Sequence, residues 1–274
     1  KGCHLRCAWC CNPESIRYKP QLGFVEKLCI NCMKCVSVCK TNALQNKNNI
    51  LSVSFDDCVA CGDCIDVCNY NALKIYGYTI TADEVMKTVL KDEKYYKTSK
   101  GGITISGGEP LYQSDFLLRI LKKAKKNNLH VCIQTSGYEE QSEFDKVIPF
   151  TDMFQFDYKL TDSDLHKRYV GRTNEKIIRN LNYLNSKNCK IVLRCVIVPG
   201  VNDEMSHFKA IAKLEKQLQN IIHIEILPYH TFGRSKYDEI GKAYQLQEES
   251  VKKEDAQKWI DILKKLGCKK VKIG

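Results

Sequence analysis

Several features are absent from the 274-residue chain, and each absence narrows the possible functions. No run of residues approaches the roughly 20 apolar residues that a membrane span needs, so no membrane partner is expected. No basic helix is interleaved with aromatic residues, which argues against nucleic acid as a partner. A signal peptide is not expected either, because a cysteine-rich loop begins at once, at Cys3.

Cysteine, by contrast, is abundant: the chain has 16, and eleven of them fall in three tight clusters. Such clustering favours metal binding over disulfides, and exposed iron–sulfur sites favour a reducing, cytoplasmic environment. The first cluster is Cys3, Cys7 and Cys10, with the spacing C-x3-C-x2-C and no fourth ligand. Three soft ligands suit a four-iron cluster and leave one iron open to bind a small molecule. A zinc loop that lacks one ligand, or incidental cysteines, is the alternative interpretation.

The other two clusters form an internal repeat. Residues 29–39 and 58–68 each read C-x2-C-x2-C-x3-C at an offset of 29 residues, and the match continues at residues 42–44 and 71–73. The spacing resembles that of bacterial two-cluster ferredoxins, in which the fourth cysteine of each run ligates the other cluster. The resemblance implies two crossed ligand sets: Cys29, Cys32, Cys35 and Cys68 for one cluster, and Cys58, Cys61, Cys64 and Cys39 for the other. Lys40 and Asn69 replace the usual proline after each run, and a zinc ribbon is the alternative.

Beyond residue 80, stretches with helical spacing alternate with short apolar runs typical of strands. The runs at 103–105, 130–135, 153–158, 191–198 and 221–227 predict strands, and amphipathic stretches near 81–96, 113–127, 174–187, 203–219 and 249–266 predict helices. This alternation predicts an α/β fold with a parallel sheet, whose chemistry collects at the C-terminal strand ends. The expected division is residues 1–22 for the first cysteine loop, 23–76 for an insertion and 77–274 for the remaining barrel.

Candidate site residues follow the predicted strands. Gly107 and Gly108 would let a ligand approach the backbone closely, and Glu109 could accept a hydrogen bond from an ammonium group. Asp157 could bind ribose hydroxyls, and Lys159 could pair with a carboxylate. The alternative for Gly107, Gly108 and Glu109 is an ordinary turn. The alternative for Asp157 and Lys159 is a structural salt bridge.

Three further candidates have equally plain alternatives. Arg194 interrupts an apolar strand and must find a partner, which could be a ligand or a structural carboxylate. His230 falls at the end of the last predicted strand, where a histidine is often structural. Trp9 lies between two cysteines and could either stack on adenine or pack in a core.

Together these motifs resemble the activating enzymes of glycyl radical enzymes, which belong to the radical S-adenosylmethionine (SAM) enzymes. The matching segments are residues 2–15, 101–111, 157–159, His166-x4-Gly171-x2-Asn174, 194–203, 227–230 and 235–237. The resemblance implies a partial (β/α)6 barrel with an inserted ferredoxin-like domain, three [4Fe-4S] clusters and SAM. The inserted domain further implies a dehydratase, a decarboxylase or a carbon–nitrogen lyase as the enzyme that is activated, and the sequence does not decide among these.

The same resemblance assigns roles. SAM would be cleaved by one electron to methionine and a 5′-deoxyadenosyl radical, which removes hydrogen from a backbone glycine of the partner enzyme. Gly107, Gly108 and Glu109 would meet the amino group of SAM. Lys159 and His230 are candidates for its methionine end, with Arg194 as a further catalytic candidate, and Asp157 and Thr135 for its ribose or a monovalent cation.

Two departures from the family pattern stand out. The first is Tyr158, at a position between the aspartate and the lysine where the family commonly has leucine. The second is the start of the chain: the family usually has a strand before the first cysteine. We therefore expect the chain to be a fragment that lacks its first barrel strand and also ends early, at Gly274. The alternatives to the implied function are a radical SAM enzyme acting on a small molecule and an electron-transfer protein.

The formal charge of +11 bears on the protein partners. Eleven thiolates and three cluster cores of +2 bring the loaded chain to about +6. This charge favours an acidic protein substrate and an acidic electron donor, flavodoxin or ferredoxin.

Overall fold

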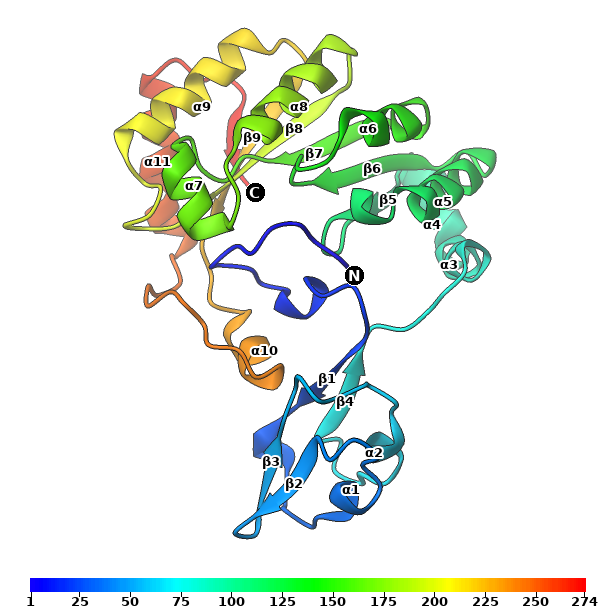
Figure 1. The fold of residues 1–274 in the computed structure, drawn as a ribbon. Helices are drawn as coiled ribbons and strands as arrows, with labels where there is room; N and C mark the ends of the chain where they lie inside the picture. Colours follow the sequence, from blue (N-terminus) through cyan, green and yellow to red (C-terminus); the bar gives the residue numbers. More distant parts are fainter.

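A computed structural model describes residues 1–274 apart from the side chain of Lys253. Its larger part is a six-stranded parallel sheet in the order β10-β9-β8-β7-β6-β5 (Figure 1). The strands are β5 (Gly102–Ile105), β6 (His130–Thr135), β7 (Met153–Asp157), β8 (Ile191–Ile197), β9 (Ile221–Pro228) and β10 (Val271–Ile273). The α/β fold is thus confirmed, and β5 and β10 are the edges of a sheet that stays open within the described residues.

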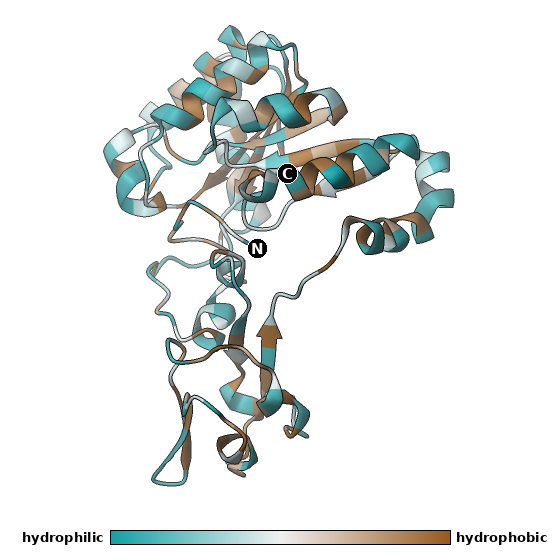
Figure 2. Cartoon of the chain, turned by 45° about the vertical axis from the view of Figure 1, so that its right-hand side comes forward, coloured by the Kyte–Doolittle hydropathy of each residue, from teal (hydrophilic) through white to brown (hydrophobic). Residues whose placement is uncertain are grey.

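Helices cover the outer face of this sheet. They are α3 (Ala82–Val89), α4 (Glu93–Ser99), α5 (Ser114–Lys126), α6 (Gln141–Val147), α7 (Ser163–Val170), α8 (Glu175–Ser186), α9 (Met205–Gln217) and α11 (Lys253–Lys265). The short helix α10 (Arg234–Glu239) lies below the sheet instead (Figure 1). The helices alternate hydrophilic and hydrophobic residues along their length, whereas the strands of the sheet are mostly hydrophobic (Figure 2). The sequence analysis missed α6, α7, α10 and the short strand β10, and it joined α3 and α4 into one helix.

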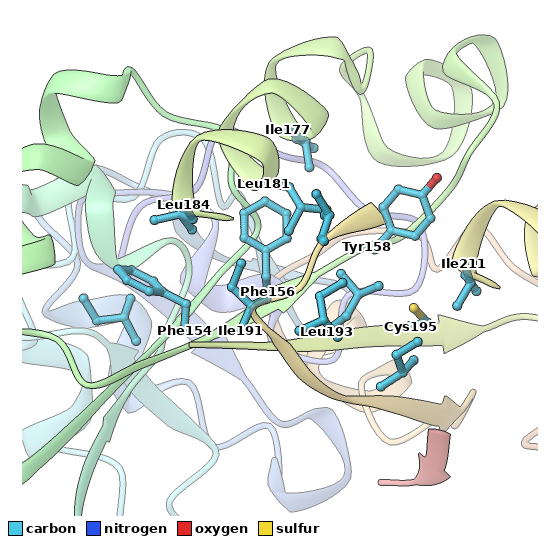
Figure 3. Packing of buried hydrophobic residues seen from close by; sticks show 14 of the residues in the cluster. Phe154, Phe156, Tyr158, Ile177, Leu181, Leu184, Ile191, Leu193, Cys195 and Ile211 are labelled. Atoms are coloured by element: carbon cyan, nitrogen blue, oxygen red, sulfur yellow. The ribbon is translucent and has the colours of Figure 1, made fainter. Parts of the chain in front are cut away.

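The main core lies between the sheet and these helices. Alternate side chains of β7 and β8, such as Phe156 and Leu193, point outward and meet Leu181 and Leu184 of α8 (Figure 3). The intervening positions of β7, among them Gln155, face the inner side of the sheet and are only partly buried. Because strand side chains alternate, the same strands build the core on one face and carry polar groups on the other.

Residues 21–76 form a separate lobe beneath the sheet (Figure 1). In this lobe β1 (Gln21–Phe24) pairs with β4 (Leu73–Tyr76), and β2 (Leu44–Lys47) pairs with β3 (Ile50–Val53), both antiparallel. The helices α1 (Lys34–Ser37) and α2 (Asp63–Asp66) precede β2 and β4. Adding 29 to each residue number maps β1 on β3, α1 on α2 and β2 on β4. The duplication therefore includes the strands as well as the cysteine runs.

In the described part of the chain, no helix is both long and apolar enough to cross a membrane.

Candidate functional site

The first cysteine loop, residues 2–16, is fixed by backbone hydrogen bonds. The amides of Arg6 and Ala8 each donate to carbonyls in the last turn of α7, at 2.8 Å. The amide of Glu109 donates to the carbonyl of Gly2 at 2.7 Å. The loop is therefore held against the turn that follows β5 and the helix that follows β7, at the C-terminal side of the sheet.

The three thiols of this loop lie in an environment that disfavours bare thiolates. Burial raises the pKa of Cys3 to about 11 and that of Cys10 to about 12, and it also raises the pKa of Cys7. A thiolate at these positions needs positive charge nearby, which a bound metal supplies. The donor set therefore fits a metal centre with three sulfur ligands.

The two glycines after β5 have different surroundings. A Cβ on Gly108 would lie 2.2 Å from the carbonyl oxygen of Gly2, so glycine is required there by the close approach of the cysteine loop. Gly107 has a φ of +135°, and a Cβ built on it would meet nothing within 4 Å. The backbone at Gly107 is thus open to a ligand, whereas the need for glycine at Gly108 comes from packing.

Glu109 is buried, with 3% of its surface exposed. One carboxylate oxygen accepts from Thr135 Oγ1 at 2.8 Å and from the Leu111 amide at 3.3 Å; the other accepts from the Ser136 amide and Oγ at 2.8 and 2.6 Å. Burial raises the pKa of Glu109, and these hydrogen bonds oppose the rise. A carboxylate has about four lone-pair sites, and protein donors fill them here. The expected bond to an ammonium group stays a prediction, and the geometry favours a supporting role.

The hydroxyl of Thr135 also has its hydrogen bonds filled by protein groups. It donates to Glu109 and accepts from the Gly137 amide at 3.0 Å, and only 1% of the residue is exposed. These bonds tie the end of β6 to the turn after β5. A contact between Thr135 and a ribose or a cation stays a prediction.

Asp157 and Lys159 lie together at the end of β7. Lys159 Nζ is 2.9 Å from Asp157 Oδ2, and both side chains are largely buried. Burial opposes the charge on Lys159, but the carboxylate of Asp157, and the negative charge of Cys7 and Cys3 when they are thiolates, hold its pKa above the ordinary value. The lysine is thus a permanent cation beside the cysteine loop.

Two buried asparagines position the segment that carries Lys159. The amide of Asn202 donates to the carbonyls of Lys159 and Val196, both at 2.8 Å, and its oxygen accepts from the Val198 amide at 2.7 Å. Asn174 donates to the next two carbonyls, at 3.1 and 2.7 Å. Both asparagines belong to motifs that the sequence analysis quoted without giving them a role.

Tyr158, the departure from the family pattern, points away from the site. Its hydroxyl donates to Thr161 Oγ1 at 2.9 Å, and its ring stacks on that of His207 at 5.5 Å. Thr161 Oγ1 and His207 Nδ1 are 2.8 Å apart. A buried polar network therefore replaces the packing of a leucine and leaves Asp157 and Lys159 facing the loop.

The remaining candidates, Arg194, His230 and Trp9, differ in whether their polar atoms have partners within the protein. Arg194 Nε lies 3.3 Å from Glu225 Oε2 on the neighbouring strand, so the arginine has a carboxylate partner within the protein. His230 Nδ1 is buried without a hydrogen-bond partner among the described residues, and the ring stacks on Phe232 at 4.4 Å. Trp9 is 7% exposed and packs in a second hydrophobic cluster with Leu160 and others. Trp9 Nε1 and Arg194 Nε are likewise buried without a hydrogen bond among the described residues, so His230 and Trp9 each have a ring nitrogen left for a ligand.

Two cavities in the lobe divide its eight cysteines into two sets. One is lined by Cys29, Cys32, Cys35 and Cys68, and the other by Cys39, Cys58, Cys61 and Cys64. These are the sets that the ferredoxin resemblance groups together. Equivalent amides donate to sulfur in each half, Asn31 to Cys29 and Ala60 to Cys58, both at 3.4 Å.

Among the described residues, no group of three or more His, Cys, Asp or Glu side chains is arranged to hold a single metal ion. In a four-iron cluster each cysteine binds a different iron, so its ligands lie farther apart than those of one ion. Cluster binding at the cavity cysteines stays a prediction.

The helix α10 connects the lobe to the first cysteine loop. Lys74 Nζ pairs with Glu239 Oε2 at 2.7 Å, and the Tyr76 hydroxyl donates to the same carboxylate. At the other side of the helix, the Tyr237 hydroxyl donates to the carbonyl of Cys7 at 3.3 Å. One short helix thus contacts both cysteine-bearing regions, which neither spacing nor periodicity predicted.

Known proteins resemble this chain in sequence and in fold. The model of the radical SAM superfamily matches residues 1–214. The chain is 34% identical over 270 residues to the (2S)-3-sulfopropanediol dehydratase activating enzyme of Klebsiella oxytoca, covering 96% of this chain and 85% of that one. It is 37% identical over 251 residues to the trans-4-hydroxy-L-proline dehydratase activating enzyme of Clostridioides difficile, covering 90% and 83%. A solved domain of a pyruvate-formate lyase-activating enzyme from Bacteroides vulgatus ATCC 8482 is 27% identical with a TM-score of 0.53, covering 64% of this chain and 99% of that one.

Proposed function

The chain belongs to the radical SAM superfamily and, within it, to the activating enzymes of glycyl radical enzymes, and on this premise we propose how its residues divide the work. A four-iron cluster bound by such an enzyme supplies the electron that cleaves SAM, and the resulting 5′-deoxyadenosyl radical takes hydrogen from a backbone glycine of the partner. The observation that carries the assignment of the site is the position of the first cysteine loop beside Lys159 and the open backbone of Gly107.

The methionine end of SAM would bind at the ends of β7 and β9. Lys159 is a buried cation, and His230 has a free ring nitrogen, so both suit the methionine carboxylate. The open backbone at Gly107 suits the amino group, and Asp157 remains the candidate for the ribose or a monovalent cation. Trp9, packed in the second hydrophobic cluster, and Arg194, paired with Glu225, would support the site without leaving these positions.

The lobe would hold two further [4Fe-4S] clusters, one in each four-cysteine cavity. Apart from cysteines, its buried apolar side chains are four leucines, Leu22, Leu44, Leu51 and Leu73, and two alanines, Ala43 and Ala72. So small a core rarely stabilises a unit of this size without disulfides or metal. Cluster binding would therefore contribute to folding as well as to electron transfer from flavodoxin or ferredoxin.

The partner is a glycyl radical enzyme, but the relatives do not identify which one. Relatives of similar identity are named for different enzymes, a sulfopropanediol dehydratase and a hydroxyproline dehydratase. We therefore propose the class of partner, a large enzyme with a reactive backbone glycine. Such a glycine reacts readily because its Cα radical is delocalised over both adjacent amides and no side chain blocks the approach.

The test is to incubate the reconstituted protein anaerobically with SAM, a reductant and the cognate lyase. A glycyl radical signal should appear by electron paramagnetic resonance. Deuterium placed on the glycine Cα of the lyase should appear in 5′-deoxyadenosine. If deuterium came only from a small metabolite and no stable protein radical formed, a small-molecule substrate would replace the protein partner.

A further inference from the structure

The two halves of the lobe have the same fold but opposite charge. Residues 21–49 carry four lysines and one glutamate, a formal charge of +3, whereas residues 50–78 carry four aspartates and one lysine, a formal charge of −3. The reversal occurs at structurally equivalent positions, since Lys27 corresponds to Asp56 and Lys34 to Asp63. The first half of the duplicated lobe is thus basic, and the second half is acidic.

The two cavities also differ in their distance from the barrel. Each cavity takes side chains from both small sheets: Leu22, Leu44 and Ile75 line the cavity of Cys58, and Leu51 and Leu73 line that of Cys29. Phe55, three residues before Cys58, lies against Gly241, just after α10. In Figure 1, α1, which carries Cys35, lies farther from the barrel than α2, which carries Cys64. The Cys58 cavity is therefore proximal to the barrel, and the Cys29 cavity is distal.

Exposed apolar and basic side chains meet at the distal cavity. Ile30 and Tyr70 line it and are 55% and 49% exposed. Lys34 also lines it and Lys27 lies two residues before Cys29; both are exposed, and neither has an ion-pair partner among the described residues. At the proximal cavity the lining lysine, Lys40, is instead paired with Asp63 at 2.7 Å.

We propose that an acidic one-electron donor protein docks over the distal cavity, on the face made by Ile30, Tyr70 and Lys34, with Lys27 close by in the chain, so that electrons enter the protein at the cluster of Cys29. The inference rests on the proposed function, because it needs clusters in both cavities. In each encounter the donor loses one electron and the distal cluster gains it. The apolar centre supplies contact area, and the lysines attract the acidic rim and orient it. The acidic half of the lobe repels the same donor from the proximal cavity.

The duplication supplies a matched pair of variants. Ile30 and Val59 occupy equivalent positions, 29 residues apart, and are 55% and 66% exposed, so Ile30→Glu and Val59→Glu introduce the same charge next to either cluster. The reconstituted full chain is mixed with reduced flavodoxin, an acidic flavoprotein, and bleaching of the iron–sulfur absorbance is followed by stopped flow at low salt. Ile30→Glu should slow the reduction about tenfold and Val59→Glu less than about twofold.

Charge reversal supplies a second pair. Lys27→Glu/Lys34→Glu should slow reduction by flavodoxin about tenfold, with the difference shrinking as salt rises. Lys209→Glu/Lys213→Glu changes the net charge equally at exposed positions on α9, far from the lobe, and should have little effect. Photoreduced 5-deazaflavin, a small neutral reductant, should reduce all variants at the rate of the unmodified protein.

Two results would overturn the inference, and they are distinguishable. If Val59→Glu slowed reduction by flavodoxin as much as Ile30→Glu did, at full iron content, the donor would not select the distal face. If the unmodified protein bound about four iron atoms instead of about twelve, the lobe would hold no clusters, and the proposed function of the lobe would fail together with the inference.

Discussion

Replacing Asn202 by alanine should show how strongly the site depends on a residue that touches no reacting atom. The side chain is 2% exposed and makes three hydrogen bonds, two donated to the carbonyls of Lys159 and Val196 and one accepted from the Val198 amide. Each bond contributes about 1 kcal/mol net, and an unsatisfied buried partner costs more. We therefore expect Asn202→Ala to lower the free energy of unfolding by about 3 kcal/mol. Asn202→Asp should lower the free energy of unfolding at least as much, because it places a carboxylate oxygen, which cannot donate, opposite the carbonyl oxygens of Lys159 and Val196.

Denaturant unfolding of the metal-free chain measures this loss, and calorimetric SAM binding to the reconstituted protein measures its effect on the site. SAM should bind more weakly, because the segment that carries Lys159 loses an anchor. The control is Asn182→Ala, which removes one exposed hydrogen bond to the carbonyl of Ile178 and should change the unfolding free energy by less than about 0.5 kcal/mol. A loss at Asn202 no larger than that of the control would refute the reasoning.

Four further predictions concern the first cysteine loop and the turn beside it. Replacing all three cysteines of the loop by alanine should lower the iron content by about four atoms and abolish SAM cleavage, and unchanged iron would remove the loop from the ligand set. Glu109→Gln turns an amide group toward two protein donors and should lower the unfolding free energy by about 2 kcal/mol, which thermal or denaturant unfolding would detect. Gly108→Ala should displace the loop, because the new methyl would lie 2.2 Å from the Gly2 carbonyl, and should reduce cluster loading. Gly107→Ala should instead weaken SAM binding at full iron content; equal iron loss in both variants would contradict the distinction.

The cysteine spacing predicted more of this protein than any other feature did. It predicted a three-ligand loop and a duplicated unit, because ligand spacing is a local property of the chain. Periodicity likewise located all five expected strands, since alternation and apolar runs are also local. It missed β10, whose three residues are too few to show a pattern. It also missed α10, a six-residue helix defined by its contacts with Tyr76 and Cys7.

The roles of individual polar residues depended on contacts between distant segments. The motif around Glu109 was evident in the sequence, but only the fold brought Ser136 and Thr135 to its carboxylate and filled its lone pairs. Gly108 was read as a place for a ligand, whereas the tertiary structure brings the Gly2 carbonyl there. The sequence by itself thus determined the kind of chemistry, through residue types and their spacing. The tertiary structure decided which of those residues remain free for a ligand, because hydrogen-bond saturation and close packing arise only when separate elements meet.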